Sequence, residues 1–177
     1  MPARIILADS VAEILTQEAR HAFREYKERA VVLIGSCGLR TFFANGIVRH
    51  KTLQERGIIL KRGIIKHKND RTVDFYIRWD REKLSQALSG EWLQGSERAL
   101  FAHAHVDGRA INSYPSIQDI KTSLSNGHTG ITFDYERSQK RLVAVGYCGQ
   151  RYIPVFARGV LLLEDKWTYI QKYGIEI

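Results

Sequence analysis

Two histidines stand one residue apart in an apolar stretch of the chain, at His103 and His105. If this stretch is a strand, residues i and i+2 point to the same side, so the two imidazoles can share one metal ion while Ala104 faces away. A catalytic zinc site takes three protein ligands and keeps a position for water. Paired histidines also occur by chance on half-exposed strands. The pair indicates a metal site only if a third ligand lies near it.

The best candidate for the third ligand is Asp119. Pro115–Asp119 has the form of a helix start, which places Asp119 in the first turn of a helix, where a short loop can fold back over the end of the histidine strand. Two neutral imidazoles and one carboxylate leave bound zinc with a net positive charge, which lowers the pKa of its water toward about 7. Ser116-x-x-Asp119 can also be a plain helix cap.

The elements that position these residues follow from the spacing of apolar side chains. A capping box at Ser10–Glu13 predicts the start of an amphipathic helix that continues to Tyr26. Asp80 is a suitable N-cap for a helix to Ser89, and further helices are expected after Pro115 and over residues 165–173.

Short strands fill much of the remaining chain. They are expected at residues 30–34, 41–48, 58–65, 72–79, 98–105, 130–135, 141–147, 152–157 and 160–163. The first two should form an antiparallel hairpin. The elements lack regular βα alternation and show no internal repeat, so the fold class is α/β or α+β with a mixed sheet flanked by helices.

Composition indicates one folded domain over residues 1–177, with 44% hydrophobic and 26% charged residues. No apolar run approaches the roughly 18 residues of a membrane span, and the first ten residues do not have the pattern of a signal peptide, so a cytoplasmic location is expected. Cys37 and Cys148 lack CxxC spacing and are expected to be buried free thiols.

The net charge of +8 is concentrated in residues 49–71, which hold eight Lys or Arg against Glu55 and Asp70. Such a segment can meet phosphates or an acidic protein surface, or can simply be a solvated face. It lacks interleaved aromatic residues and any helix-turn-helix pattern, so nucleic acid is not favoured as a partner.

Taken together, the candidate residues resemble the JAMM (MPN+) metalloproteases, whose motif is an upstream glutamate, then H-x-H, then S-x-x-D. The matching residues are Glu28, His103, His105, Ser116 and Asp119. The order of expected elements also resembles that family over nearly the whole chain. The resemblance therefore implies a JAMM/MPN-like, cytidine-deaminase-like mixed β-sheet flanked by helices.

The sequence departs from the family motif at several places. The segment Glu28–Gly35 keeps the family spacing from glutamate to a strand-end glycine, but Val31 replaces the first glycine of that pattern. Val106 replaces the proline that usually follows H-x-H. Ser113 stands at the shorter spacing often seen in the family, yet only Ser116 is followed three residues later by an aspartate, so Ser116 is the preferred match.

The resemblance implies a role for each matched residue. His103, His105 and Asp119 would hold Zn2+, and Glu28 would act as general base toward the zinc-activated water and then protonate the leaving amine. Ser116 would donate a hydrogen bond to the oxyanion. The activity implied is that of a zinc metalloprotease, a deubiquitinase-like isopeptidase.

The implied partner is a protein with a flexible C-terminal tail, such as a ubiquitin-like or sulfur-carrier protein, whose amide bond after the tail is cut. The tail could lie extended beside an exposed sheet edge, and residues 49–71 could steer an acidic partner. The alternative is an inactive MPN-type scaffold that uses residues 49–71 to bind protein or nucleic acid.

Two other hydrolase families share part of the histidine pattern. The H-x-H-x-D-H motif of metallo-β-lactamase-like hydrolases overlaps His103–Asp107, but Gly108 occupies the position of its last histidine, and that fold needs a longer chain. An amidohydrolase barrel can also begin with H-x-H, yet it requires about 250 residues. Neither fits this chain well.

Overall fold

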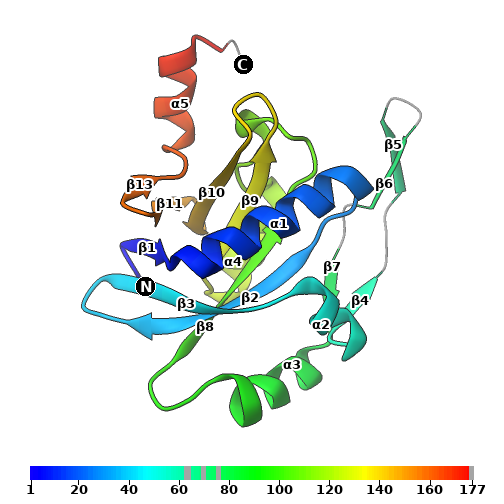
Figure 1. The fold of residues 1–177 in the computed structure, drawn as a ribbon, viewed down its shortest axis with the longest axis vertical. Coiled ribbons are helices and arrows are strands. Elements are labelled where there is room, and N and C mark those ends of the chain that lie inside the picture. Colours follow the sequence, from blue (N-terminus) through cyan, green and yellow to red (C-terminus); the bar gives the residue numbers. More distant parts are fainter. Residues whose placement is uncertain (62–64, 69–70, 75–76, 176–177) are drawn as a thin grey trace.

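The computed structural model describes residues 1–61, 65–68, 71–74 and 77–175, and within them a curled mixed sheet of nine strands forms the centre of the fold (Figure 1). Across the sheet the strands follow the order β11 (Arg151–Ile153), β10 (Arg141–Cys148), β9 (Gly130–Glu136), β8 (Arg98–Ala104), β2 (Ala30–Cys37), β3 (Thr41–Val48), β1 (Arg4–Leu7), β12 (Val155–Ala157) and β13 (Val160–Leu161). The pairs β8–β9, β1–β3 and β1–β12 are parallel and the others are antiparallel. The expected mixed α/β class is confirmed.

Helices flank this sheet, and two short ladders complete the described structure. The helices are α1 (Asp9–Glu25), α2 (His50–Glu55), α3 (Arg81–Ala87), α4 (Ile117–Asn126) and α5 (Lys166–Tyr173), with a π-helical turn at Leu88–Trp92 and a 3-10 turn at Ala110–Asn112. The ladders pair β4 (Ile59–Lys61) with β7 (Ile77–Trp79) and β5 (Ile65–Lys68) with β6 (Arg71–Asp74). Across the described parts of the chain, no helix is long and apolar enough to cross a bilayer.

Helix α1 covers one face of the sheet. Its buried side chains, such as Leu15 and Ala19, recur at helical spacing and pack against alternate residues of the central strands, such as Leu33 and Phe133. The predicted helix is confirmed, but its capping box is wrong: the N-cap is Ala8, which has no side-chain cap bond. The chain enters α1 directly from β1, and its backbone is fixed because the Ala8 N–H donates to the Ala44 carbonyl.

The opposite face of the sheet is covered by two separate apolar clusters. One is built from α2, α3, β4 and β7 around Leu53 and Leu84, and packs on β2 and β8. The other brings α5 and the 3-10 turn onto β10 around Tyr114, Leu163 and Tyr169. The central strands between these clusters present polar side chains on this face.

The predicted hairpin of residues 30–34 and 41–48 is confirmed, although β2 continues to Cys37. Strand β2 has a bulge between Ile34 and Gly35. A Cβ on Gly35 would lie only 1.9 Å from the Phe43 carbonyl oxygen of β3. Only glycine permits this approach.

The predicted strand 152–157 is divided at Pro154, which has no N–H to donate to a ladder. Its two halves pair with different strands, β11 with β10 and β12 with β1. The chain thus leaves one edge of the curled sheet and joins β1 near the other edge.

Other predictions hold in part. Asp80 caps α3 as expected, since its side chain accepts from the Lys83 N–H. The predicted strand 72–79 forms parts of two different ladders, with residues 75–76 outside the described part of the chain. Of the predicted strand 58–65, the structure describes β4 and the first residue of β5, and residues 62–64 lie outside the described part. Cys37 and Cys148 are free, but Cys37 is exposed and Cys148 only half-buried, because both lie where a strand meets its turn.

Candidate metal centre

The two histidines lie at the end of β8 on the face opposite α1. Strand β8 ends at Ala104, and the His105 N–H extends the pairing by donating to the Phe133 carbonyl at 2.8 Å. His103 stands beside Ala30 of β2 and Thr132 of β9. The strand alternation thus directs both imidazoles into the gap between the two apolar clusters, as the spacing predicts.

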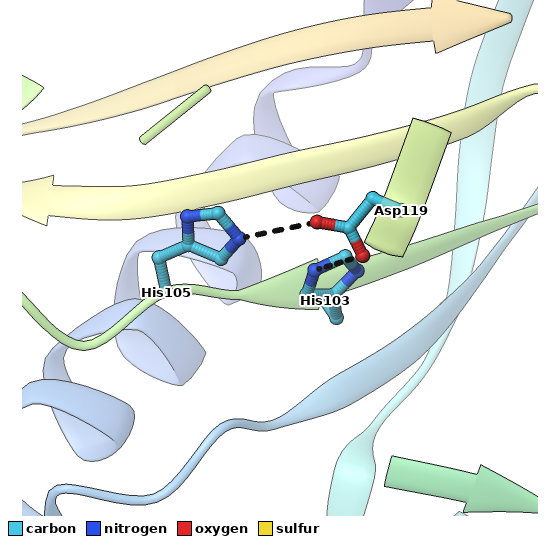
Figure 2. Close-up of side chains that lie close together, drawn as sticks. All are labelled: His103, His105 and Asp119. Carbon is cyan, nitrogen blue, oxygen red and sulfur yellow. Dashed lines mark ion pairs between the residues drawn. The ribbon is translucent and has the colours of Figure 1, made fainter. Parts of the chain in front are cut away.

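Asp119 approaches both rings from the first turn of α4, which lies above the histidine strand (Figure 2). Its Oδ1 is 3.3 Å from His103 Nε2, and its Oδ2 is 3.8 Å from His105 Nε2. The three side chains are partly buried, and their ligand atoms lie within 4.8 Å of one another. The loop between β8 and α4 therefore brings together the three residues predicted to hold a metal.

Ser116 fixes the orientation of the Asp119 carboxylate. The two residues form a capping box, in which the Asp119 N–H donates to Ser116 Oγ and the Ser116 N–H donates to Asp119 Oδ2. The Ser116 hydroxyl also donates to Oδ2, at 2.6 Å. The helix-cap interpretation of Ser116-x-x-Asp119 is therefore correct, and the cap turns Oδ1 toward the histidines.

The tautomer of His105 is set by a backbone contact. Its Nδ1 lies 2.7 Å from the Asn112 carbonyl oxygen, and since a carbonyl can only accept, Nδ1 carries the proton. In the neutral ring, Nε2 then has a free lone pair that faces Asp119. A ligating histidine is oriented in this way by a second hydrogen bond in most metal sites.

The charges at the site favour an ionised, negative Asp119 and a protonated, positive His105. Burial disfavours the ionised carboxylate, but contacts with His103 and His105 outweigh burial and hold the pKa of Asp119 far below its usual range. Burial likewise disfavours a charged His105 ring, yet Asp119, the Asn112 carbonyl and Glu28 outweigh it and raise the pKa of His105. A bound cation would meet an ionised carboxylate ready to coordinate it.

Glu28 lies just before β2, directly across from His105. The register pairs Ala30 with His103, and the Arg29 carbonyl accepts from the Ala104 N–H at 2.7 Å, so Glu28 continues the row opposite His105. Alternation puts Glu28 on the same face as both histidines, and it lines the same cavity. The residue matched by the looser part of the motif therefore stands beside the predicted ligands.

These residues line one cavity of about 1890 Å³ that is open to solvent. From the histidines it extends past Phe101 to Trp79 on one side and His128 on the other. The ring centroid of Phe101 lies 5.4 Å from that of Trp79 and 6.4 Å from that of His128. The cavity thus joins a polar centre to an aromatic wall.

Ser113 lies outside this cavity. It is fully buried, its hydroxyl donates to the Arg109 carbonyl, and its own carbonyl accepts from Thr132 Oγ1. Ser116, in contrast, lines the cavity beside Asp119. The geometry favours Ser116 in the choice between the two serines.

Residues that the sequence did not single out support the site. Asp134 is buried and accepts from the Gly108 N–H, which holds the loop after His105. Burial raises the pKa of Asp134 to about 7.

Glu18 of α1 is fully buried and bonds to Arg29 at 2.6 Å and to Arg49 at 2.8 Å. Glu18 thus anchors the residue that follows Glu28. The sequence contains one signal for Asp134 and Glu18: each is an acidic residue at an inward-facing position of its strand or helix.

Histidines outside the metal centre differ in their surroundings. His50 is buried, and its Nδ1 accepts from the Ala30 N–H, so it has a structural role. His128 lines the aromatic end of the cavity, a position that no pattern in the surrounding sequence indicates. His21 is exposed on α1.

Three cations of the basic segment have ion-pair partners. Arg49 pairs with Glu18, Lys51 with Glu55, and Arg56 with Glu91. The side chains of the other five, from Lys61 to Arg71, lie outside those that the structure describes.

Comparison with known proteins supports the fold. No protein-family model matches the chain, and no curated protein matches it significantly. Among solved structures, it is similar to the solution structure of a protein from Desulfitobacterium hafniense determined by a structural genomics consortium, with a TM-score of 0.57 and 13% identity over 89% of this chain and 94% of that chain. At this identity the similarity shows a shared fold.

The donor set of the centre suits a divalent transition metal. Two imidazoles and one carboxylate are the ligands of several zinc hydrolases, and the same set also holds non-haem iron in other enzymes. His105 has the protonation and second hydrogen bond that a ligand needs, and Ser116 holds the carboxylate in place. The residues therefore fit a divalent metal ion such as zinc or iron.

Proposed function

We propose that this chain is a zinc-dependent amide hydrolase of the JAMM/MPN+ type. The observation that carries the proposal is the convergence of His103, His105 and Asp119 in one cavity with a further carboxylate, Glu28. A carboxylate beside the ligand set serves hydrolysis, because it can move a proton between water and a leaving group. This neighbour favours zinc hydrolysis over iron chemistry.

Each residue has a distinct part in the proposed reaction. His103, His105 and Asp119 would hold the ion, which when bound would supply Lewis-acid polarisation of the carbonyl and lower the pKa of the attacking water. Glu28 accepts the proton of that water and delivers it to the leaving amine, so the carboxylate is regenerated in each cycle.

Ser116 acts first on Asp119. Its hydroxyl donates to Asp119 Oδ2, so it keeps the carboxylate in the orientation that faces the histidines. The oxyanion role implied by the family resemblance requires this hydroxyl to turn away from Asp119 during the reaction.

The shape of the cavity supports an extended peptide as substrate. It leads from the metal centre along Phe101 to Trp79 and Asp80 at the end of β7. Within the described residues β7 pairs with β4 alone, so its other edge can accept a strand. We infer that the substrate is the C-terminal tail of a ubiquitin-like or sulfur-carrier protein, cut at the amide bond that follows the tail.

The alternative of an inactive scaffold that binds through residues 49–71 has less support. Arg49, Lys51 and Arg56 each face an acidic partner of the same chain. These pairings reduce the positive charge that the first part of the segment offers to another molecule.

The test is amide hydrolysis by the zinc-loaded protein, measured on ubiquitin-like tails joined through an amide to a fluorophore and to a lysine side chain. Glu28→Gln should retain zinc but lose about 10²- to 10⁴-fold in kcat, because the proton acceptor is gone. Glu13→Gln, on the exposed side of α1, is the matched control and should keep full activity. Absence of hydrolysis by the zinc-loaded wild type, or full activity of Glu28→Gln, would contradict the proposal.

A further inference from the structure

Tyr147 of β10 stands on the same face of the sheet as the histidines. The register aligns it with Gly130 of β9, and Gly130 with Phe101 of β8, which lies two residues before His103. Residues paired across a sheet share a face, so this row runs parallel to the row that contains His103. Tyr147 also lines the cavity, although it is only 4% exposed.

Gly130 lets the phenol of Tyr147 lean across β9. A Cβ at position 130 would lie 2.5 Å from both Cζ and Oη of Tyr147, so the outer end of the ring occupies the space that a side chain would fill. The hydroxyl is thereby carried from β10 over β9 toward β8. Any other residue at position 130 would displace it.

The Tyr147 hydroxyl differs from those of Tyr114, which is buried, and Tyr152, which is half-buried. Tyr114 Oη donates to the Glu164 carbonyl, and Tyr152 Oη donates to the Leu163 carbonyl. Tyr147 Oη makes no hydrogen bond to any of the residues that the structure describes. A buried hydroxyl is normally paired, so one that reaches into a cavity without a protein partner is available to a ligand.

The charged groups that act on Tyr147 belong to the metal centre. Burial first, and then the negative charges of Asp119 and Glu28, raise the pKa of Tyr147 above its ordinary value. The phenol therefore keeps its proton at neutral pH and can act as a hydrogen-bond donor. The Ser116 hydroxyl, in contrast, already donates its proton to Asp119.

We propose that Tyr147 Oη donates a hydrogen bond to the carbonyl oxygen of the substrate amide, where negative charge develops during hydrolysis. This assignment rests on the proposed hydrolytic function. No bond to Tyr147 forms or breaks, and its proton stays on the phenol; the proton transfers belong to Glu28. A donor aimed at the developing oxyanion stabilises the transition state more than the bound substrate.

The test uses Tyr147→Phe, which keeps the ring and removes the hydroxyl. On a substrate that the wild type cuts, kcat should fall about 10²- to 10³-fold with little change in KM, as when one oxyanion donor is removed. Zinc content and melting temperature should stay at wild-type values, because the hydroxyl bonds to no described residue. Tyr135→Phe is the matched control, since its hydroxyl lies outside the cavity and accepts from Arg20.

A second readout does not depend on turnover. A glycine-rich peptide phosphonate carries tetrahedral, negatively charged oxygens like those of the hydrolytic transition state, and its binding to zinc-loaded protein can be measured by calorimetry. Tyr147→Phe should bind it about 10- to 100-fold more weakly, the value of one hydrogen bond to a charged group.

The two proposals fail in different ways. A wild type that binds the phosphonate, together with a Tyr147→Phe variant that binds it equally well and keeps full kcat, overturns the assignment of Tyr147 alone. A zinc-loaded wild type that neither binds the phosphonate nor cuts any amide overturns the hydrolytic function, and the role of Tyr147 with it.

Discussion

The α1 face of the main sheet and the face opposite α1 are covered in different ways. On the α1 face one continuous apolar cluster joins the helix to the central strands, with Leu15, Leu33 and Phe133 fully buried. On the opposite face two clusters leave a cavity between them, and the strands place His103 and His105 there. The closed face gives the strands a rigid support, and the open face uses that support to hold polar groups in fixed positions.

The largest effect on folding is expected on the α1 face. Leu15→Ala removes a fully buried side chain and should lower the free energy of unfolding by about 2 to 5 kcal/mol, because a cavity is left under the helix. Zinc bound per folded chain should not change. Urea denaturation followed by metal analysis checks both parts. A stable Leu15→Ala variant that loses zinc would contradict the conclusion that the α1 face supports the fold while the opposite face holds the metal.

An intermediate effect is expected where the two faces are linked. Glu18 bonds to Arg29 and Arg49, and although burial alone would raise its pKa, the two guanidinium groups outweigh burial and lower it. Glu18→Gln should therefore lower the free energy of unfolding by about 1 to 3 kcal/mol at neutral pH.

The Glu18 effect should depend on pH with a defined sign. A carboxyl with a lowered folded pKa stabilises the protein above its ordinary pKa of about 4.3 and loses that contribution as the pH falls through its folded pKa. The gap between wild type and Glu18→Gln should therefore narrow as the pH is lowered below that ordinary value. Urea denaturation from pH 7 to pH 3 measures this gap, and a constant gap would argue against the ionised pair.

The smallest effect on folding is expected at the histidines. His103 is partly exposed and its contacts are polar, so His103→Ala should change the free energy of unfolding by about 1 kcal/mol or less when a chelator is present. Added zinc should stabilise the wild type, since a ligand that binds the folded state shifts unfolding, and should not stabilise the variant. Thermal unfolding with and without zinc checks this, and equal stabilisation of both proteins would remove His103 from the centre.

The local features of both faces could be predicted from sequence, whereas their long-range pairing could not. Apolar spacing predicts α1, and the Asp80 and Ser116 caps predict the starts of α3 and α4, because these signals lie within a few residues of one another. The strand β1 was missed, since its four residues are recognisable only through their pairing with β3 and β12. Pro154, in contrast, is a local signal that a strand is interrupted, and only the different pairing partners of the two halves depend on the fold.

The candidate site shows the same limit. His103, His105, Ser116 and Asp119 lie close in sequence and were predicted together, and the resemblance added Glu28. Tyr147 could not be found in this way, because its position depends on Gly130 of the neighbouring strand, whose missing side chain leaves space for the Tyr147 ring. The sequence does not show which glycine contacts which ring.

Metal content tests the central claim most directly. Protein purified without added chelator should carry near one zinc per chain by mass spectrometric metal analysis, and both Asp119→Ala and His103→Ala should lose it. His21→Ala, which removes an exposed histidine of α1, should keep it. Wild-type protein that holds iron instead of zinc, or that takes up no zinc when zinc is supplied, would contradict a zinc hydrolase centre on the open face of the sheet.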